Sequence, residues 1–374
     1  MKNYLKHIIK KIFGTSKSPD KGNHLEEIVK RFLGRDKHIK SIRPFGSGHI
    51  NDTYKVETSG GNFILQRINH KIFKDIEGLS WNIMLINEYI NRNEQNFDLK
   101  IPEFYSCCGD YYTGWQGNYW RLMSFIEDSK SYDLVPNEAI ALEGGKAYGK
   151  FVKILSGFPV NDLKETIPQF HDIDFRLKNF EDAVDKDIAG RVKQTQAEID
   201  FIRQRASKMY SILQLGIAGK IPVRVTHNDT KINNVLFNRN DKAIAVIDLD
   251  TVMPGYVHYD FGDAIRTFTN TANEDEPDLS KVGINMEYFK AFARGFLSET
   301  KDILTPAEKN HLAFSAQLMT YIIGMRFFTD YLSGDTYFKT AYPEHNLVRA
   351  RAQFKLLESM EMHYDEMKDF IKRL

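Results

Sequence analysis

The chain has 374 residues, 42% of them hydrophobic and 27% charged, and a formal net charge of +1 at pH 7. This length is enough for two lobes with separate cores, and the balanced charge argues against a large nucleic-acid-binding surface. The two cysteines, Cys107 and Cys108, are adjacent, so they cannot staple distant segments or form a C-x-x-C metal site. This cysteine usage suits a reducing cytoplasm.

The N-terminal stretch 1–23 reads as a basic amphipathic segment followed by a polar linker. Apolar residues from Leu5 to Phe13 fall on one helical face, with lysines around them. These lysines interrupt any signal-peptide core, and no apolar run in the chain approaches the length of a membrane span. We expect the segment to pack on the body of the protein or to form a loose tail. The alternative is a peripheral membrane helix at residues 1–13.

A small β-rich N-terminal lobe is predicted over residues 24–126, after a short helix at 24–34. Its first hairpin contains the glycine turn Gly46, Ser47 and Gly48. Backbone amides in such a turn can lie over nucleotide phosphates, because glycine allows close approach. The alternative is a plain hairpin turn, since Asn51 stands where a protein kinase has a third glycine.

The next strand, Asn62–Ile68, is where kinases carry a phosphate-binding lysine, but it contains none. Arg67 is the nearest cation, and a solvated arginine is the competing interpretation. Glu88, on a predicted helix over residues 78–96, is the candidate partner for Arg67. An edge strand then leads to a hinge, where an adenine would bond to backbone groups near Ser124, Phe125 and Ile126.

The remainder, residues 127–374, is predicted to be a larger and mainly helical lobe. Asn137 is expected to cap the first of its helices. The other predicted helices are 175–189, 192–215, 286–300, 306–332 and 347–374. The fold class is therefore α+β, with a small antiparallel β-rich lobe, a hinge and a helical lobe.

One segment, residues 221–250, interrupts the helical pattern with β structure and carries the clearest chemistry. A buried strand at 221–225 leads into the loop His-Asn-Asp-Thr-Lys-Ile-Asn-Asn. Two short strands follow, Val235–Phe237 and Ala243–Ile247, joined by a turn-rich tetrapeptide. Since a hairpin returns the chain to its starting edge, we expect residues on either side of it to lie close together.

That hairpin brings Asp248 close to Asn234, facing Asp229. Phosphoryl transfer needs a carboxylate to orient and deprotonate a hydroxyl, and oxygen ligands that hold Mg²⁺ against nucleotide phosphates. The pattern H-x-D-x-x-x-x-N, then hairpin, then Asp matches the protein-kinase catalytic loop and its metal-binding aspartate. Asp260 begins a D-F-G string but lies beyond a Pro-Gly turn, so we expect it to support the loop from below.

Several strings together resemble the aminoglycoside-phosphotransferase/choline-kinase group of kinase-like small-molecule kinases, and within it the N-acetylhexosamine 1-kinases. The strings are GSGHINDTY, VTHNDTKINNVLF, AVIDLDTVMPG, YDFGDAIRTF with the acidic NEDE after it, and RFFTDYLSGDTYFKTAYPEHNLVRARAQ. They extend from about residue 40 to about residue 360, and the second and third are the most specific.

The resemblance implies ATP- and Mg²⁺-dependent phosphorylation of the anomeric hydroxyl of an N-acetylhexosamine. It makes Asp229 the catalytic base and Asn234 and Asp248 the metal ligands, with Arg326 and Tyr337 contacting the sugar. We expect Asp250 to contact the acceptor as well, and Asp229 to touch it during transfer. Where many relatives have a phosphate-binding lysine, this chain has glutamine and arginine, so that contact is open.

The residues alone leave other interpretations. Arg326 and Asp330 stand four apart on a predicted helix, and could grip hydroxyls or form an ordinary ion pair. Composition does not separate a sugar from an amino alcohol or an aminoglycoside. A nucleotide-binding module without activity is disfavoured by the complete Asp229, Asn234 and Asp248 set. We expect a cytoplasmic monomer whose partners are ATP and a small sugar, with no nucleic acid.

Overall fold

The computed structural model describes residues 21–46, 50–93 and 98–374. These residues form two compact units. The first holds the chain up to His70 together with Glu103–Phe125, and the second holds Lys71–Pro102 and Ile126–Leu374. The predicted N-terminal lobe, 24–126, is therefore divided. Its segment 71–102 groups with the C-terminal part of the chain.

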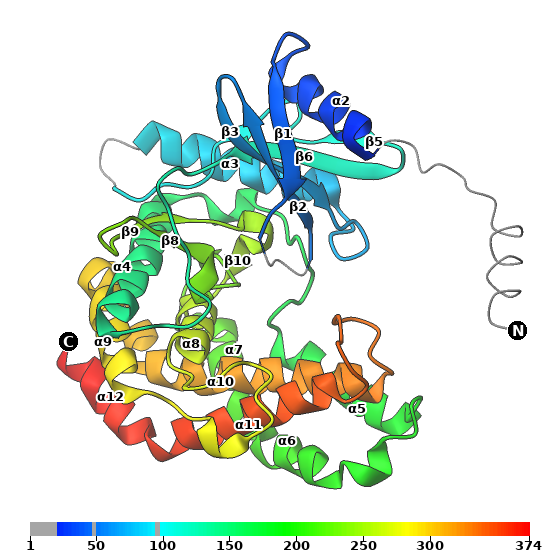
Figure 1. Ribbon diagram of the computed structural model, residues 1–374. Coiled ribbons are helices and arrows are strands. Elements are labelled where there is room, and N and C mark those ends of the chain that lie inside the picture. The colour runs from blue at the N-terminus through cyan, green and yellow to red at the C-terminus, as the bar shows by residue number, and fades with distance from the viewer. Residues whose placement is uncertain (1–20, 47–49, 94–97) are drawn as a thin grey trace, which may run out of the picture. The chain divides into compact units, whose positions relative to one another are not determined.

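The first unit is an antiparallel sheet covered by one helix, α2 (Lys21–Leu33) (Figure 1). Its strands run in the order β1-β2-β3-β6-β4, with β5 paired to β6. Their bounds are β1 Ile39–Pro44, β2 Asp52–Thr58, β3 Gly61–Ile68, β4 Phe104–Tyr105, β5 Thr113–Trp115 and β6 Asn118–Ser124. This matches the β-rich lobe expected from the sequence.

Strand alternation gives this sheet two different faces. Leu65 of β3 and Leu122 of β6 pair in register and are fully buried against Ile28 of α2. Their neighbours Gln66 and Arg121, also paired in register, point to the opposite face. The sheet therefore has an apolar core under α2 and a second face on which the polar pair Gln66 and Arg121 lies beside the apolar pair Ile64 and Met123.

The glycine turn falls only partly in the described chain. Gly46 has φ +78°, a left-handed conformation that favours glycine, and the amide of Phe45 donates to the carbonyl of Thr53 beside it. Ser47 and Gly48, the other predicted phosphate-binding residues of the turn, lie outside the described residues, as does the 1–20 segment.

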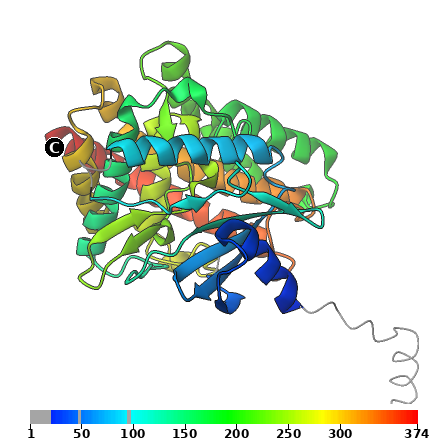
Figure 2. The ribbon, with the colours of Figure 1, turned by 90° about the horizontal axis from the view of Figure 1, so that it is seen from above.

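The second unit is mainly helical. Its α-helices are α3 Ile76–Asn93, α4 Glu138–Ile154, α5 Ile173–Lys186, α6 Gln196–Met209, α7 Ser211–Ile217, α8 Val257–Phe268, α9 Met286–Thr300, α10 Pro306–Leu332, α11 His345–Met362 and α12 Tyr364–Arg373. Short 3-10 helices occur at Leu155–Gly157, Val160–Asp162, Val192–Gln194, Ile232–Asn234, Leu249–Thr251 and Leu279–Lys281. Both views show α11 running along α10 (Figures 1 and 2).

Two predicted helices agree with the structure in their bounds, and Asn137 does cap α4, accepting from the Ile140 amide at 3.0 Å. Other expectations were less accurate. The predicted helix 192–215 is divided by a break at Tyr210, and 347–374 by a break at His363. In the part of the chain that the structure covers, no helix has the length and apolar character needed to cross a membrane.

Candidate active site

Two small antiparallel sheets in the second unit position the candidate catalytic loop. Strand β7 (Arg224–Thr226) pairs with β10 (Met253–Gly255), and β8 (Val235–Phe237) pairs with β9 (Ala243–Val246). The predicted strand at 221–225 is thus shorter and begins later. The amide of Ile247 donates to the carbonyl of Asn234 at 2.9 Å, which brings Asn234 next to Asp248 as the hairpin predicted.

Asp229 is the centre of the loop's polar contacts. Its Oδ2 lies 2.9 Å from Nζ of Lys231 and accepts a hydrogen bond from Nδ2 of Asn234 at 3.1 Å. The same Nδ2 donates to the Asp229 carbonyl at 2.9 Å. Burial alone would raise the pKa of Asp229, but the Lys231 charge and these hydrogen bonds outweigh it and lower the pKa. Asp229 is therefore a carboxylate at neutral pH.

Asp260 supports the loop from below, as predicted. Its two carboxylate oxygens accept from the backbone amides of His227 and Asn228, at 2.8 and 2.7 Å. Helix α8 can bring Asp260 this close because Gly262 packs directly on α10, where a Cβ would lie 2.2 Å from the Ser315 carbonyl. These bonds stabilise Asn228 in a left-handed conformation, φ +62°, and so set the direction of the loop.

Two buried histidines brace the loop from its sides. His227 Nε2 contacts the Ile247 carbonyl at 3.0 Å, while its Nδ1 accepts from the Asp229 amide at 3.3 Å. A carbonyl can only accept, so His227 is the neutral Nε2–H tautomer. His171 Nε2 likewise donates to the Asn228 carbonyl at 3.0 Å, and burial lowers the pKa of His171 to about 3. Both neutral rings therefore hold the loop in place through these hydrogen bonds.

Lys231 is a site residue that the sequence interpretation missed. Its Nζ pairs with Asp229, and its backbone carbonyl accepts from the Tyr148 hydroxyl at 2.8 Å. Burial would lower the pKa of Lys231, but the nearby charges of Asp229 and Asp248 raise it. The available signal was its position two residues after the predicted catalytic aspartate.

The residues around Asp248 differ in accessibility. Asp248 has φ +63° and precedes the 3-10 helix Leu249–Thr251. Asp250, predicted to contact the acceptor, is only 2% exposed, and its carbonyl accepts from the Thr166 hydroxyl at 2.8 Å. Asp250 is not among the residues that line the cavity described next, and we leave it out of the acceptor site proposed below.

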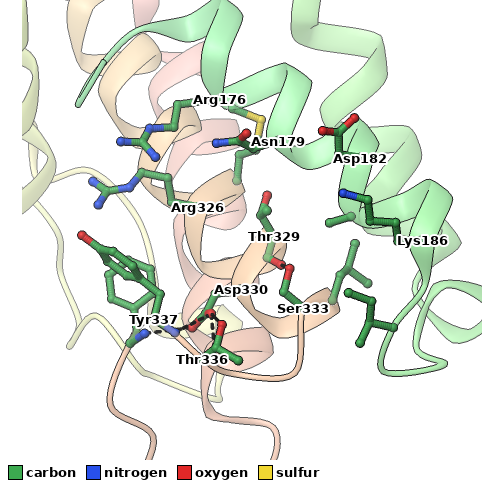
Figure 3. A pocket seen from close by; sticks show the side chains of 15 residues that line it. Arg176, Asn179, Asp182, Lys186, Arg326, Thr329, Asp330, Ser333, Thr336 and Tyr337 are labelled. Atoms are coloured by element: carbon green, nitrogen blue, oxygen red, sulfur yellow. Dashed lines mark hydrogen bonds between the residues drawn. The ribbon is translucent and has the colours of Figure 1, made fainter. Parts of the chain in front are cut away.

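A cavity of about 340 Å³ lies between α5 and α10, and both predicted sugar contacts, Arg326 and Tyr337, line it (Figure 3). The Tyr337 ring is half exposed, and its hydroxyl points toward Arg326. The other polar lining residues are Arg176, Asn179, Asp182, Lys186, Thr329, Asp330, Ser333 and Thr336. The cavity is of the size that small-molecule sites have in proteins.

Of the two alternatives considered for Arg326 and Asp330, the ordinary ion pair does not form. Asp330 instead accepts from the amides of Thr336, Tyr337 and Phe338, at 2.8 to 2.9 Å, and from Asn346 at 2.9 Å. Arg326 lies over aromatic rings, 4.7 Å from the centroid of Phe170. In the turn after α10, three backbone amides donate to the one carboxylate of Asp330. The four-residue spacing of Arg326 and Asp330 could not indicate these hydrogen bonds.

Comparisons with known proteins identify the fold. The structure is similar to an aminoglycoside phosphotransferase from Alicyclobacillus acidocaldarius, with TM-score 0.65, 11% identity and 97% and 100% of the two chains covered. It is also similar to an ethanolamine kinase from Plasmodium vivax, with TM-score 0.57, 14% identity and 94% of each chain covered. A spectinomycin phosphotransferase, solved with ADP and spectinomycin, gives TM-score 0.57, 13% identity and coverage of 93% and 100%.

A family model described as "Phosphotransferase enzyme family" matches residues 41–281, which include the glycine turn and the whole loop. The chain belongs to this family. At the family level it is a small-molecule kinase, and the two-lobed, protein-kinase-like fold expected from the sequence is confirmed.

In this phosphotransferase, the predicted nucleotide residues Arg67 and Glu88 make other contacts. Arg67 pairs across the strands with Asp52 and donates to Asn118 at 3.1 Å. Glu88 pairs with Arg92, one turn further along α3, at 3.1 Å. The two predicted partners therefore belong to different units, and each has a partner within its own unit.

Arg121, another cation of the first unit, was not considered in the sequence interpretation. Arg121 is 2% exposed, and its Nη2 and Nε donate to Oε1 of Gln66 at 2.7 and 3.0 Å. Gln66 is one of the two residues that stand where relatives have the phosphate-binding lysine. On the face away from α2, Arg121 is thus the cation that bonds directly to Gln66, with Lys55 of β2 on the same face.

Some backbone groups of the predicted hinge residues already form hydrogen bonds within the protein. The Ser124 amide donates to the Glu103 carbonyl at 2.8 Å, and the Phe125 amide donates to the Asn62 carbonyl at 3.1 Å. The Ile126 carbonyl accepts from the Ser129 hydroxyl at 2.6 Å. An adenine bound here would use the other backbone atoms of this stretch.

The possible metal ligands at the loop suit Mg²⁺, which takes few ligands from the protein, better than a metal coordinated by protein side chains alone. In the described chain, no group of three or more His, Cys, Asp or Glu residues could hold a metal ion. Asn234 directs its amide nitrogen to Asp229, which leaves its carbonyl oxygen Oδ1 as the atom for a ligand. One amide oxygen plus the Asp248 carboxylate is a set that Mg²⁺ completes with phosphates and water.

Proposed function

We propose that this protein transfers the γ-phosphoryl group of ATP to the anomeric hydroxyl of an N-acetylhexosamine, GlcNAc or GalNAc, giving the 1-phosphate. The observation that carries the proposal is the Asp229 carboxylate, bonded to Asn234 and paired with Lys231. The family and the resemblance to N-acetylhexosamine 1-kinases support it further.

Asp229 would accept a hydrogen bond from the attacking hydroxyl and orient its oxygen toward the phosphorus. Because its pKa is lowered, Asp229 is a weak base, and the proton passes to it late, as the bond to phosphorus forms. The Lys231 ammonium is close enough to the same oxygen to stabilise the negative charge that develops on the transferred group. Asp260 and the two histidines keep this geometry fixed.

Asn234 Oδ1 and Asp248 would hold Mg²⁺, which when bound neutralises charge on the phosphate oxygens. On the first unit, we propose that Arg121, rather than Arg67, supplies the cation for the phosphates. Arg121 is buried beside Gln66, whereas Arg67 is exposed and already paired with Asp52.

Arg326 and Tyr337 would contact the sugar, as the resemblance implies. The cavity that they line also contains Arg176. Its carboxylates, Asp182 and Asp330, are already bonded to Lys178 and to backbone amides, so the two guanidinium groups would repel a cationic acceptor. This observation favours a sugar over the alternative acceptors, an aminoglycoside, choline or another amino alcohol. The solved relatives named as ethanolamine and spectinomycin enzymes keep those acceptors as the second candidate class.

Replacing Asp229 with Asn tests the catalytic role. Turnover should fall by several orders of magnitude, because the amide cannot take the proton, while the affinity for ATP changes little. Glu361→Gln, which removes a carboxylate paired with Arg205 elsewhere on the helical unit, is the control and should keep normal turnover. Near-normal turnover in Asp229→Asn would contradict the assignment.

A further inference from the structure

Two arginines in the cavity between α5 and α10 lie close together without a carboxylate partner. Figure 3 shows the guanidinium groups of Arg176 and Arg326 next to each other, pointing the same way. Arg176 donates through Nε and Nη2 to the Phe170 carbonyl, at 3.0 and 2.7 Å, which leaves its Nη1 free for a ligand. Arg326 contacts only aromatic faces and the Tyr337 hydroxyl. Within the residues covered by the structure, neither arginine forms an ion pair.

The carboxylates near the two arginines are committed elsewhere. Asp330 is saturated by three backbone amides and Asn346, and Asp182, which lines the same cavity, pairs with Lys178 at 3.1 Å. Asp172 caps α5 through the Phe175 amide at 2.9 Å, and Asp263 binds Arg266 at 2.9 Å. Burial and the neighbouring charge of Arg326 lower the pKa of Arg176 to about 9. The protein therefore keeps two like charges together and does not neutralise either of them.

The arginines are connected to the catalytic loop through a short segment. Phe170 contacts both of them, with its carbonyl on Arg176 and its ring under Arg326. The next residue, His171, donates to the Asn228 carbonyl, directly before Asp229. His171 is within electrostatic range of Arg176, Arg326 and Asp229, so it lies between the arginine pair and the catalytic loop.

From this arrangement we infer that the acceptor carries an anionic oxygen group, a carboxylate or a phosphate ester, which Arg176 and Arg326 bind at the end remote from the phosphorylated hydroxyl. Two adjacent guanidinium groups offer parallel N–H donors that match such a group. The inference rests on the proposed function for the position of the hydroxyl. It narrows the acceptor from N-acetylhexosamines in general to an acidic derivative.

The test measures kcat/KM of the whole protein for matched acceptors. N-acetylmuramic acid, which carries a carboxylate, is compared with its uncharged methyl ester, and N-acetylglucosamine 6-phosphate with N-acetylglucosamine. We expect kcat/KM for at least one acidic sugar to exceed that for its neutral counterpart about tenfold or more, because the acidic group gains a charge-assisted hydrogen bond. Equal values within both pairs would overturn the inference.

Substitution of Arg176 provides the second arm. Arg176→Gln should reduce kcat/KM for the acidic sugar about tenfold more than for its neutral counterpart, a ratio that a general folding defect would not change. Arg203→Gln, which removes an exposed arginine paired with Glu181 outside the cavity lining, is the matched control and should leave both values unchanged. Equal losses for the two acceptors in Arg176→Gln would overturn the inference.

Binding separates failure of the inference from failure of the proposed function. If none of the four sugars is phosphorylated, the proposed function fails, and calorimetric titration with the same sugars decides the anion site. Tighter binding of an acidic sugar, weakened about tenfold by Arg176→Gln, would support the site. Equal affinities would contradict it. Inorganic phosphate is titrated as well. If it binds as tightly as the acidic sugar and loses as much affinity in Arg176→Gln, the arginines bind a free anion, and the acceptor assignment is overturned.

Discussion

Nζ of Lys231 lies 2.9 Å from Oδ2 of Asp229, and this pair sets the charge at the centre of the proposed active site. Burial favours a protonated Asp229, whereas the ammonium group favours the carboxylate and prevails. The lysine thus keeps this side chain ionised, and under the proposed function it would also stabilise charge on the transferred group.

Lys231→Met should therefore change both the rate and its pH dependence. Without the ammonium, burial dominates and the pKa of Asp229 rises, so the acid limb of kcat/KM should move to higher pH. Since activity requires the carboxylate, it is lost as pH falls through that pKa. We expect kcat near neutral pH to fall on the order of a hundredfold.

A pH–rate profile of Lys231→Met against the parent protein tests this. Lys242→Met, which removes an exposed lysine paired with Glu143, is the control and should reproduce the parent profile. An unchanged acid limb in Lys231→Met would show that Lys231 does not control the ionisation of Asp229.

The phosphate-contacting cation can be found by comparing two arginines of the first unit. If Arg121 is that cation, Arg121→Met should raise KM for ATP about tenfold or more, because the buried charge proposed to bind phosphate is lost. Arg67→Met removes an exposed arginine whose partner is Asp52, and should change KM less than twofold. Initial-rate kinetics with varied ATP would decide, and the reverse order of the two effects would favour Arg67 instead.

Protonation of His171 should contribute to the loss of folding stability at low pH. Its folded-state pKa of about 3 lies below the ordinary 6.5, so the unfolded chain takes up the proton first. Stability due to His171 is therefore complete above pH 6.5 and declines as pH falls toward 3. By pH 5 the loss is about 2 kcal/mol.

His171→Asn keeps a side-chain donor for the Asn228 carbonyl but cannot be protonated. Denaturant unfolding between pH 7 and 5 should show the parent protein losing about 2 kcal/mol more than this variant. The charged groups nearest the ring, Arg176, Arg326 and Asp229, are the same in both proteins. Parallel stability curves would rule out this role for His171.

Asp260 should matter for stability and for rate together. In Asp260→Ala the amides of His227 and Asn228 lose their acceptor, at a cost of about 1–3 kcal/mol for each buried group. The loop would also lose its direction, so kcat should fall more than KM rises. Asp278→Ala, an exposed carboxylate that caps a short turn, is the control for thermal unfolding and turnover.

The sequence predicted best what short-range signals determine. Helix α10 begins where Thr305, Pro306 and Glu308 form a capping box with proline at the first position, and the predicted and observed bounds agree. The hairpin that joins Asn234 to Asp248 was equally local. By contrast, the breaks at Tyr210 and His363 interrupt patterns that remain helical on both sides, so periodicity did not indicate them.

Side-chain partners depend on register and tertiary contacts, which the sequence did not specify. Arg67 meets Asp52 because β2 and β3 pair in that register, and Arg121 meets Gln66 through the register of β3 and β6. Neither pairing follows from spacing along the chain. In the same way, the commitment of Asp330 to the turn after α10 depends on the path of that turn.

Product analysis with an acceptor panel tests the central claim most directly. The protein is given ATP and Mg²⁺ with GlcNAc, GalNAc, glucose, galactose, choline, kanamycin or no acceptor, and with the acidic sugars named above. The account predicts an acid-labile 1-phosphate of an N-acetylhexosamine, neutral or acidic, and no product from choline or kanamycin. Turnover confined to an amine acceptor, or ATP binding without turnover of any acceptor, would contradict it.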